Sequence, residues 1–387
     1  MCGIMGKITF AGEHETPEEF DRALAQLNHR GPDDRGAHHA VTPDGVRISI
    51  GQTRLSILDL SEAGHQPMQS PRTGSWMVYN GEAYNFREVR GELEREGLAF
   101  QSECDTEVLL AAYDHGGEEF IQPFHGMFAI CIWDVRRNRV VLLRDRLGIK
   151  PLYYFWDGRQ FAFASEVTAL AALPTLSLNV SQYAIRQFLM RGFIPHPLSI
   201  FENVWKLPAG HRLVLDLARP LPSPVFYWDS LDYYARPASF RNENEVLDAI
   251  DERLRKAVKL RLVSDVPLGA FLSGGVDSSL VVSMMRQVHT GEVRTFSIGF
   301  EEEQGGLPIL DATGEKDEPE ASRLRTGGLF DLAIKDNKLL AEQSIFGDEV
   351  RLGASQVSSS AKHHRMAGRL SEMQESLFKE SDETVEQ

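Results

Sequence analysis

A cysteine stands at position 2, directly after Met1, in the sequence MCGIMG. Removal of Met1 is expected because the residue that follows it is small. Cys2 then carries a free α-amine beside its thiol, and an amine that titrates near pH ~8 can act as general base for that thiol. Taken alone, a cysteine here is more often a chance small residue in a buried first strand.

A glycine- and serine-rich turn, SGGVDSS at residues 273–279, lies between a predicted apolar strand and a predicted helix. Its glycines let backbone amides approach an anion, its serines add donors, and the helix N-terminus adds partial positive charge. No Gly-Lys-Ser or Gly-Lys-Thr sequence is present in it, so the loop is not of the Walker type. The pattern predicts a phosphate site, although Ser-Gly-Gly alone is common in turns.

Four further residues could contribute to a site for an amino-acid substrate. Arg54 offers a planar fork for a carboxylate, or it is an exposed arginine at the end of a strand. Asp105 can hold an ammonium group, cap the helix that starts near Thr106, or do both. Asn80 and Gly81 form a pair that by itself most often marks a tight hairpin turn.

The elements that must position these residues follow from hydrophobic patterning. We expect strands at residues 46–58, 75–85, 126–134, 139–145 and 160–166, and helices at 17–30 and 86–97. This mixture predicts a layered α+β domain. Prolines concentrate between residues 195 and 237, where we place a boundary. Beyond it, a helix at 242–262, strands at 266–272 and 293–300, and a helix at 280–288 predict a βαβ unit.

Composition limits the classes of function. The chain has 387 residues and a net charge of −15, which disfavours nucleic acid and anionic membrane surfaces as partners. No apolar stretch approaches the ~20 residues of a membrane helix, and the N-terminus lacks the pattern of a signal peptide. Three cysteines argue against a disulfide framework and predict a reducing compartment, the cytoplasm by default.

Taken together, the motifs resemble those of class II glutamine amidotransferases, and more closely those of glutamine-hydrolysing asparagine synthetases. The matching segments are MCGIMG (1–6), HRGPDD (29–34), RLSILD (54–59), YNGEAYN (79–85), SECDTEVLL (102–110), RDRLGIKPLYY (144–154) and LPAGH (207–211). The resemblance extends over about the first 300 residues. It implies an αββα sandwich of the amino-terminal-nucleophile hydrolase class, followed by a partial α/β Rossmann-like nucleotide-binding domain.

The resemblance also implies roles for single residues. Cys2 would cleave glutamine, with the Asn80 side chain and the Gly81 amide as oxyanion hole. The implied glutamine pocket consists of Arg54, Leu55, Ser56, Ile57, Leu58, Asn80, Gly81, Glu82 and Asp105. The implied ATP site consists of Leu272, Ser273, Gly274, Gly275, Asp277, Ser278, Ser279 and Ile298, with Asp277 also near Mg²⁺. Ammonia would convert adenylated aspartate to asparagine, releasing AMP after pyrophosphate.

These expectations divide the chain into an amidotransferase domain (2–200), a proline-rich connection (201–240), a partial synthetase domain (241–303) and an acidic, poorly ordered tail (304–387). The family's later SGDGGDE-type motif is not found in the tail, where GDEV at 347–350 lacks the glycine pair. Truncation, a frame change or an alternative ending would each explain this. We expect glutamine hydrolysis to persist, whereas ATP-dependent synthesis is the part in question.

Two alternatives stay open. The chain could transfer ammonia to another carboxylate acceptor, or it could be a non-catalytic remnant that binds glutamine or a full-length partner. A homodimer is compatible with either. Retention of Met1 would block the proposed nucleophile and favour the remnant.

Overall fold

The computed structural model describes residues 1–234 and 239–297. Chain contacts divide the protein into two compact units, Met1–Leu268 and a second unit that begins at Gly269, and each is described by itself. The predictions for Ile298 and for the tail at 304–387 lie outside the described residues.

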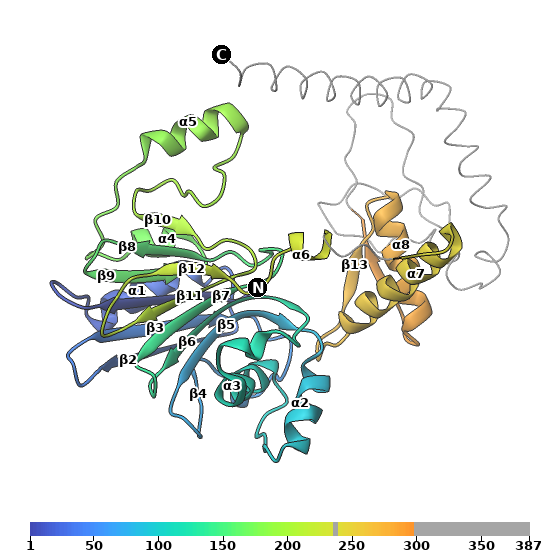
Figure 1. The fold of residues 1–387 in the computed structure, drawn as a ribbon, viewed down its shortest axis with the longest axis horizontal. Coiled ribbons are helices and arrows are strands. Elements are labelled where there is room, and N and C mark those ends of the chain that lie inside the picture. Colours follow the sequence, from blue (N-terminus) through green and yellow to red (C-terminus); the bar gives the residue numbers. More distant parts are fainter. Residues whose placement is uncertain (235–238, 298–387) are drawn as a thin grey trace, which may run out of the picture. The chain divides into compact units, whose positions relative to one another are not determined.

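Two antiparallel sheets of six strands form the first unit (Figure 1). The first sheet contains β1 (Gly3–Thr9), β2 (Asp34–Val41), β3 (Arg47–Arg54), β8 (Tyr153–Trp156), β9 (Gln160–Ala164) and β10 (Val204–Lys206), in the order β10-β8-β9-β1-β3-β2. The second contains β4 (Met68–Gln69), β5 (Trp76–Ala83), β6 (Gly126–Asp134), β7 (Arg139–Arg144), β11 (His211–Asp216) and β12 (Ser223–Phe226), in the order β12-β11-β7-β6-β5-β4. β1 directly follows Cys2, and β5 contains Asn80 and Gly81. Both strands lie inside their sheets and not at the edges.

Side chains of the sheets alternate between two buried environments. On β6, Cys131 and Trp133 pack between the sheets, whereas Ile130 and Ile132 pack under the helices of the second sheet. Successive residues of a strand point to opposite faces, so a strand covered on both sides is apolar throughout. This explains the uninterrupted apolar run of β6 that the sequence shows.

Helices cover the outer face of each sheet. Residues of α1 (Pro17–Leu24), η1 (Ala25–Leu27) and α4 (Val167–Ala171) pack on the first sheet, and those of α2 (Phe86–Arg95), α3 (Asp105–Gly116) and η3 (Gly117–Ile121) pack on the second. The predicted αββα layering is therefore present. Thr16 and Glu19 form a capping box at the start of α1, which also has Pro17 in its first turn, as the local sequence favours.

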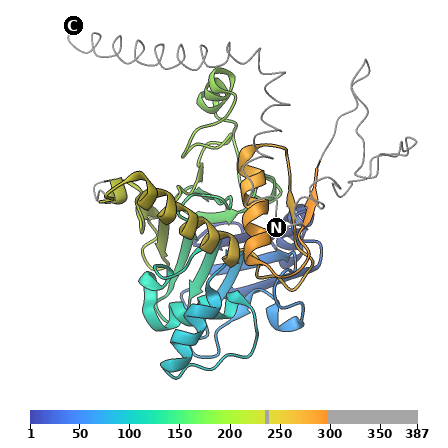
Figure 2. The same cartoon turned by 90° about the vertical axis from the view of Figure 1, so that its right-hand side faces the viewer.

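The remaining elements of the first unit are η2 (Glu62–Gly64), α5 (Gln182–Arg191), α6 (Leu231–Tyr234) and α7 (Glu243–Leu260). Both views show α5 projecting from the strands of this unit (Figure 2). Among the described residues, no helix is both long enough and apolar enough to cross a membrane.

The predicted connection at 201–240 differs from what the structure contains there. β10, β11 and β12 all lie in this range and extend the two sheets. Pro208 lies between β10 and β11, and Pro224 lies on β12, which is the last strand of its sheet. Prolines are tolerated in loops and on edge strands, so a high proline content does not separate a linker from the end of a sheet.

In the second unit, β13 (Gly269–Phe271) and β14 (Arg294–Phe296) pair in parallel, with α8 (Val276–Val288) between them in the chain. This is the predicted βαβ arrangement, with shorter strands than expected. The helix begins within the SGGVDSS turn, at Val276, and Gly275 is its N-cap.

Candidate active site

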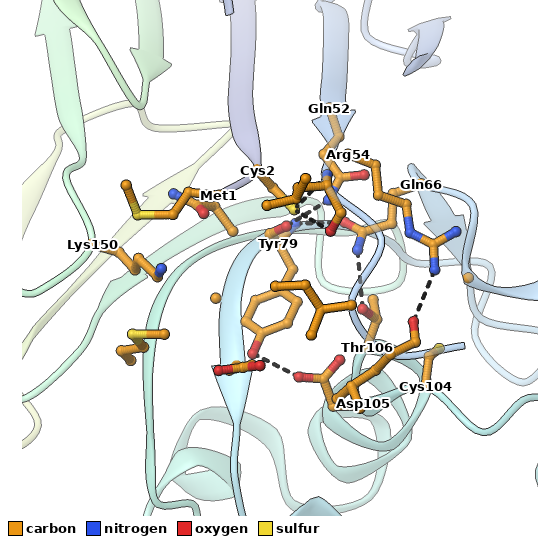
Figure 3. A pocket seen from close by; sticks show the side chains of 18 residues that line it. Met1, Cys2, Gln52, Arg54, Gln66, Tyr79, Cys104, Asp105, Thr106 and Lys150 are labelled. Carbon is orange, nitrogen blue, oxygen red and sulfur yellow. Dashed lines mark hydrogen bonds between the residues drawn. The ribbon is translucent and has the colours of Figure 1, made fainter. Parts of the chain in front are cut away.

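A cavity of about 140 Å³ opens beside Cys2 in the first unit (Figure 3). It has the scale of an amino-acid side chain and is smaller than pockets that hold drug-sized molecules. We call it the Cys2 pocket. Its lining residues are Met1, Cys2, Gln52, Arg54, Leu55, Ile57, Leu58, Gly64, Gln66, Tyr79, Asn80, Gly81, Glu82, Cys104, Asp105, Thr106, Met127 and Lys150. Both sheets and the start of α3 therefore contribute to it.

Cys2 lies immediately before β1, and its thiol is held by backbone. Its Sγ donates to the Leu55 carbonyl at 3.8 Å and accepts from the Leu55 amide at 3.4 Å. Arg30 Nε donates to the Cys2 carbonyl at 3.0 Å, and Glu166 pairs with the Arg30 guanidinium at 2.8 Å. Burial raises the pKa of the Cys2 thiol, so it needs a base or a nearby cation before it can react.

Asn80 and Gly81 lie in the middle of β5, so the hairpin interpretation of this pair is wrong. Asn80 is 0% exposed, and neither polar atom of its side chain has a hydrogen-bond partner among the described residues. A buried amide without partners is costly, and it is expected where a ligand completes the bonds. At Gly81, an added Cβ would lie 2.3 Å from the Met127 carbonyl oxygen, so β5 and β6 require glycine there.

Asp105 is buried at the first position of α3, and Cys104 is the N-cap without a side-chain capping bond. The carboxylate instead accepts from the Tyr79 hydroxyl and from the Ala83 amide, each at 2.9 Å. It therefore joins α3 to β5. Burial raises the pKa of Asp105, and these hydrogen bonds oppose that rise.

Arg54 is only 7% exposed, so the alternative of an exposed strand-end arginine is wrong. Its guanidinium donates to the carbonyls of Leu58, Asp59 and Ser61 and so fixes the loop after β3. An added Cβ at Gly64 would lie 2.0 Å from an Arg54 nitrogen, so glycine lets this loop close over the guanidinium. Leu55, Ile57 and Leu58 of the loop line the Cys2 pocket.

Two predicted glutamine-binding residues are placed differently from each other. Glu82 lines the Cys2 pocket, and burial raises the pKa of its carboxyl. Ser56 does not line it; its amide donates to Asp33 at 2.8 Å, and it faces a neighbouring surface hollow. The loop turns outward at Ser56, so consecutive residues of RLSILD do not all face the same cavity.

Several residues of the Cys2 pocket lie outside the set predicted from the sequence. Gln52 donates to the Tyr79 carbonyl, and Gln66 accepts from the Tyr79 amide, each at 2.7 Å. Gln66 also donates to Thr106 at 3.0 Å, which ties β5 to α3. No sequence pattern marked these glutamines, because their partners are distant in the chain. Lys150 did carry a signal, since it belongs to the RDRLGIKPLYY segment.

The SGGVDSS turn of the second unit is built from local contacts. Ser278 Oγ accepts from the Ser273 amide at 3.3 Å and donates to the Gly275 carbonyl at 3.1 Å, and Ser279 Oγ also donates to Gly275. Gly274 has a φ of +79°, which favours glycine. Asp277 is exposed in the first turn of α8. The residues from Ser273 to Ser279 thus sit together around a helix N-terminus, and Leu272 is buried beside them.

A resident metal centre is not evident in the parts of the chain that the structure describes. Within residues 1–234 and 239–297, no group of three or more His, Cys, Asp or Glu side chains could hold a metal ion. Mg²⁺ in nucleotide sites is held by one or two carboxylates together with the substrate phosphates. The exposed Asp277 fits that limited role.

The fold and the site together define a sandwich in which a cysteine next to the N-terminus faces a small pocket. The glutamine amidotransferase domain family matches residues 1–227, and the chain belongs to this family. The asparagine synthase family matches residues 249–324.

Individual relatives agree with these matches. The chain is 38% identical over 327 residues to the putative asparagine synthetase (glutamine-hydrolyzing) 2 of Methanocaldococcus jannaschii, covering 80% of this chain and 62% of that protein. It is 35% identical over 297 residues to the amidase chry2 of Gibberella zeae, covering 74% and 43%. A glutamine phosphoribosylpyrophosphate amidotransferase from B. subtilis, solved with ADP and GMP, aligns at a TM-score of 0.44 with 17% identity, covering 74% and 64%. The chain thus spans about half the length of the curated relatives it matches.

Proposed function

We propose that this chain hydrolyses glutamine to glutamate and ammonia, with Cys2 as nucleophile after removal of Met1. The observation that carries the proposal is the buried, unpartnered Asn80 amide in the pocket that Cys2 lines. An amide N–H and a backbone N–H at neighbouring positions are the donors that an oxyanion needs. Membership of the glutamine amidotransferase family supports glutamine as the substrate.

The proposed reaction needs only one residue for both base and nucleophile. The Cys2 amine takes the thiol proton, and sulfur attacks the side-chain carbonyl carbon of glutamine. The resulting oxyanion is stabilised by the Asn80 side chain and the Gly81 amide. The amine then gives its proton to the leaving nitrogen, the C–N bond breaks, and ammonia departs. Water, deprotonated by the same amine, cleaves the thioester and regenerates the thiol.

Arg54, Glu82 and Asp105 would hold the amino-acid end of glutamine. Three guanidinium N–H groups of Arg54 are used by the loop, and its Nε–H has no partner among the described residues. That donor is available for the α-carboxylate. Asp105 and Glu82 supply carboxylate oxygens for the α-ammonium. Leu55, Ile57 and Leu58 would enclose the methylene groups, and Ser56 would contribute only through the backbone of the same loop.

For the second unit we propose nucleotide binding. Ser273, Gly274 and Gly275 would cradle pyrophosphate with Ser278 and Ser279, Leu272 and Ile298 would flank the adenosine, and Asp277 would hold Mg²⁺ together with the phosphates. The bound metal would neutralise phosphate charge while an acceptor carboxylate is adenylated. The asparagine synthase match and the first relative's printed name support aspartate as acceptor, and asparagine, AMP and pyrophosphate as products.

A different acceptor is the second candidate. The relative named amidase chry2 is nearly as similar as the first, so similarity at this level does not fix the acceptor. Comparing ammonia-dependent AMP formation with aspartate and with other carboxylates separates the two.

We also propose a cytoplasmic location and a homodimer, which cell fractionation and light scattering test.

The decisive experiment measures glutamate release by the purified chain whose N-terminus has been determined by mass spectrometry. We expect processed protein that begins at Cys2 to hydrolyse glutamine, and Cys2→Ala to lose at least about a thousandfold in kcat. Cys131→Ala is the matched control, because this thiol is buried in the core away from the pocket. Activity that survives in Cys2→Ala, or that persists in chains retaining Met1, would contradict the proposed nucleophile.

A further inference from the structure

Lys150 is a buried cation in the Cys2 pocket. Its side chain lines the pocket although the residue is only 3% exposed. Figure 3 shows it on the same side of the pocket as Met1, across from Arg54. Its ammonium has no hydrogen bond or ion pair with any of the residues that the structure describes. A buried ammonium without partners is costly, so its retention calls for an anion that appears during function.

The loop that carries Lys150 is fixed by its backbone. Arg144 donates to the carbonyls of Lys150, Gly148 and Leu207 at 2.8, 2.8 and 2.6 Å. Asp145 accepts from the amides of Ile149 and Lys150, each at 2.9 Å. The Lys150 backbone is therefore bonded through both its N–H and its C=O.

The same carboxylate also holds the strand that faces the oxyanion residues. Asp145 accepts from the Phe128 amide at 3.2 Å, and Phe128 pairs with Gly81 in the β5–β6 register. The position of Lys150 is thus tied to the position of Gly81. Such preorganisation matters for a charge that must act at a defined point, since it removes the cost of reorganisation during reaction.

Several charged groups surround the Lys150 ammonium and the start of the chain. Glu82 and Asp145 attract the ammonium, and Arg30 repels it. Asp105 opposes ionisation of the Cys2 thiol, and Asp33 favours the charged form of the Met1 amine, the terminal amine of the unprocessed chain. Lys150 acts against both of these carboxylates. Burial raises the pKa of the Cys2 thiol and lowers that of the Met1 amine, and the charge of Lys150 lowers the pKa of both groups.

We propose that Lys150 is the electrostatic activator of Cys2: its fixed ammonium stabilises the thiolate and, once Met1 is removed, favours the neutral form of the adjoining Cys2 amine, the base that accepts the thiol proton. This inference rests on the proposed glutamine hydrolysis. It assigns to Lys150 the role of favouring the thiolate of Cys2 and the neutral form of its amine near neutral pH. Lys150 itself gains and loses no proton in the cycle.

The test compares Lys150→Met and Lys150→Arg with the processed wild-type chain. In the absence of glutamine, the rate of Cys2 alkylation by iodoacetamide is followed against pH, with the modified residue identified by mass spectrometry. We expect Lys150→Met to slow alkylation at pH 7 by roughly tenfold and to move the profile to higher pH, because the thiolate fraction falls. Lys150→Arg keeps the charge and is expected to restore most of the rate. Lys259→Met, which removes an exposed lysine from α7, is the matched control.

A second profile, kcat/KM for glutamine against pH, is expected to shift its acidic limb to higher pH in Lys150→Met, because the amine holds its proton longer. An unchanged alkylation profile in folded Lys150→Met overturns the inference, and so does a rise in KM alone, which would assign Lys150 to substrate binding. If Lys150→Met does not fold, Lys150→Gln takes its place, and an alkylation profile of folded Lys150→Gln equal to that of wild type overturns the inference equally. Wild-type chain without glutaminase activity would refute the proposed function, while the alkylation profile would still decide the role of Lys150.

Discussion

The Cys2 pocket and the SGGVDSS turn are both proposed to bind small substrates, but they are constructed in opposite ways. Residues of the pocket come from both sheets and the start of α3, and the central ones are buried. Those of the turn are contiguous, mostly exposed, and hydrogen-bonded chiefly to each other. A site held by distant elements is rigid before substrate arrives, and those of its residues that bond or pack across the fold cannot change without disturbing it. A local turn depends on the conformations of a few residues.

Substituting one glycine in each region should show this difference most strongly. Gly81→Ala puts a methyl group 2.3 Å from the Met127 carbonyl, so β5 and β6 must separate. We expect a loss of about 3 kcal/mol in the free energy of unfolding, together with loss of glutaminase activity. Gly274→Ala meets no atom within 4 Å and is strained only by its φ of +79°, at a cost of about 1 kcal/mol. Denaturant unfolding of both variants measures the contrast, and equal costs would argue against it.

The next largest effect concerns two buried asparagines of the first unit. Asn80→Ala removes an amide without protein partners, so we expect kcat to fall by about a hundredfold or more while stability changes little. Asn85 is a matched control, because its side chain donates to the Pro123 carbonyl and accepts from the His125 amide. Asn85→Ala should lower stability by about 1–3 kcal/mol and leave the kcat of folded enzyme close to wild type. The reverse pattern would remove Asn80 from the oxyanion hole.

Arg54→Lys tests whether glutamine binding depends on the several N–H donors of the Arg54 guanidinium. Lysine keeps the charge but cannot bond three carbonyls and a substrate carboxylate together. We expect KM for glutamine to rise by roughly tenfold, with a smaller change in kcat, because the loop after β3 loosens. Arg212→Lys changes an arginine that pairs with Glu118 and Glu119 outside the pocket, and it should leave KM unaltered. An unchanged KM in Arg54→Lys would show that the loop holds without the guanidinium.

The same contrast explains what the sequence could predict. The SGGVDSS turn, the start of α1 and the strands β3, β5, β6, β7 and β9 depend on neighbouring residues, and patterning located them to within a few positions. Asn80 and Gly81 were read as a turn on local grounds, yet pairing with β6 places them in mid-strand. Asp105 is predicted to hold an ammonium group, cap a helix or do both, and the structure shows Tyr79 and Ala83 donating to its carboxylate. Only the family resemblance linked these positions to one pocket.

Residues whose hydrogen-bond partners are distant in the chain could not be identified from local sequence patterns either. Gln52 and Gln66 are joined to β5 by contacts between strands that periodicity cannot register. Proline content also did not reveal β10, β11 and β12, because loops and edge strands tolerate proline. Lys150 stood in a segment already recognised, but its role needed the fixed loop and the burial that only three-dimensional structure provides.

The smallest expected effect is that of Ser278→Ala in the second unit. Its hydroxyl connects Ser273 to Gly275 within the turn, and the loss of such partly exposed bonds costs about 0.5–1 kcal/mol. If the turn binds nucleotide, ATP affinity should fall severalfold, since both the donor and the shape of the cradle change. Ser283→Ala is the matched control, because this serine lies further along α8, outside the turn, where its hydroxyl accepts from the Gln287 side chain. Titration with ATP and Mg²⁺ measures affinity, and glutamine hydrolysis by both variants should equal wild type. A parallel loss of glutaminase activity would mean that the two regions are coupled and that the local character of the turn does not make it independent.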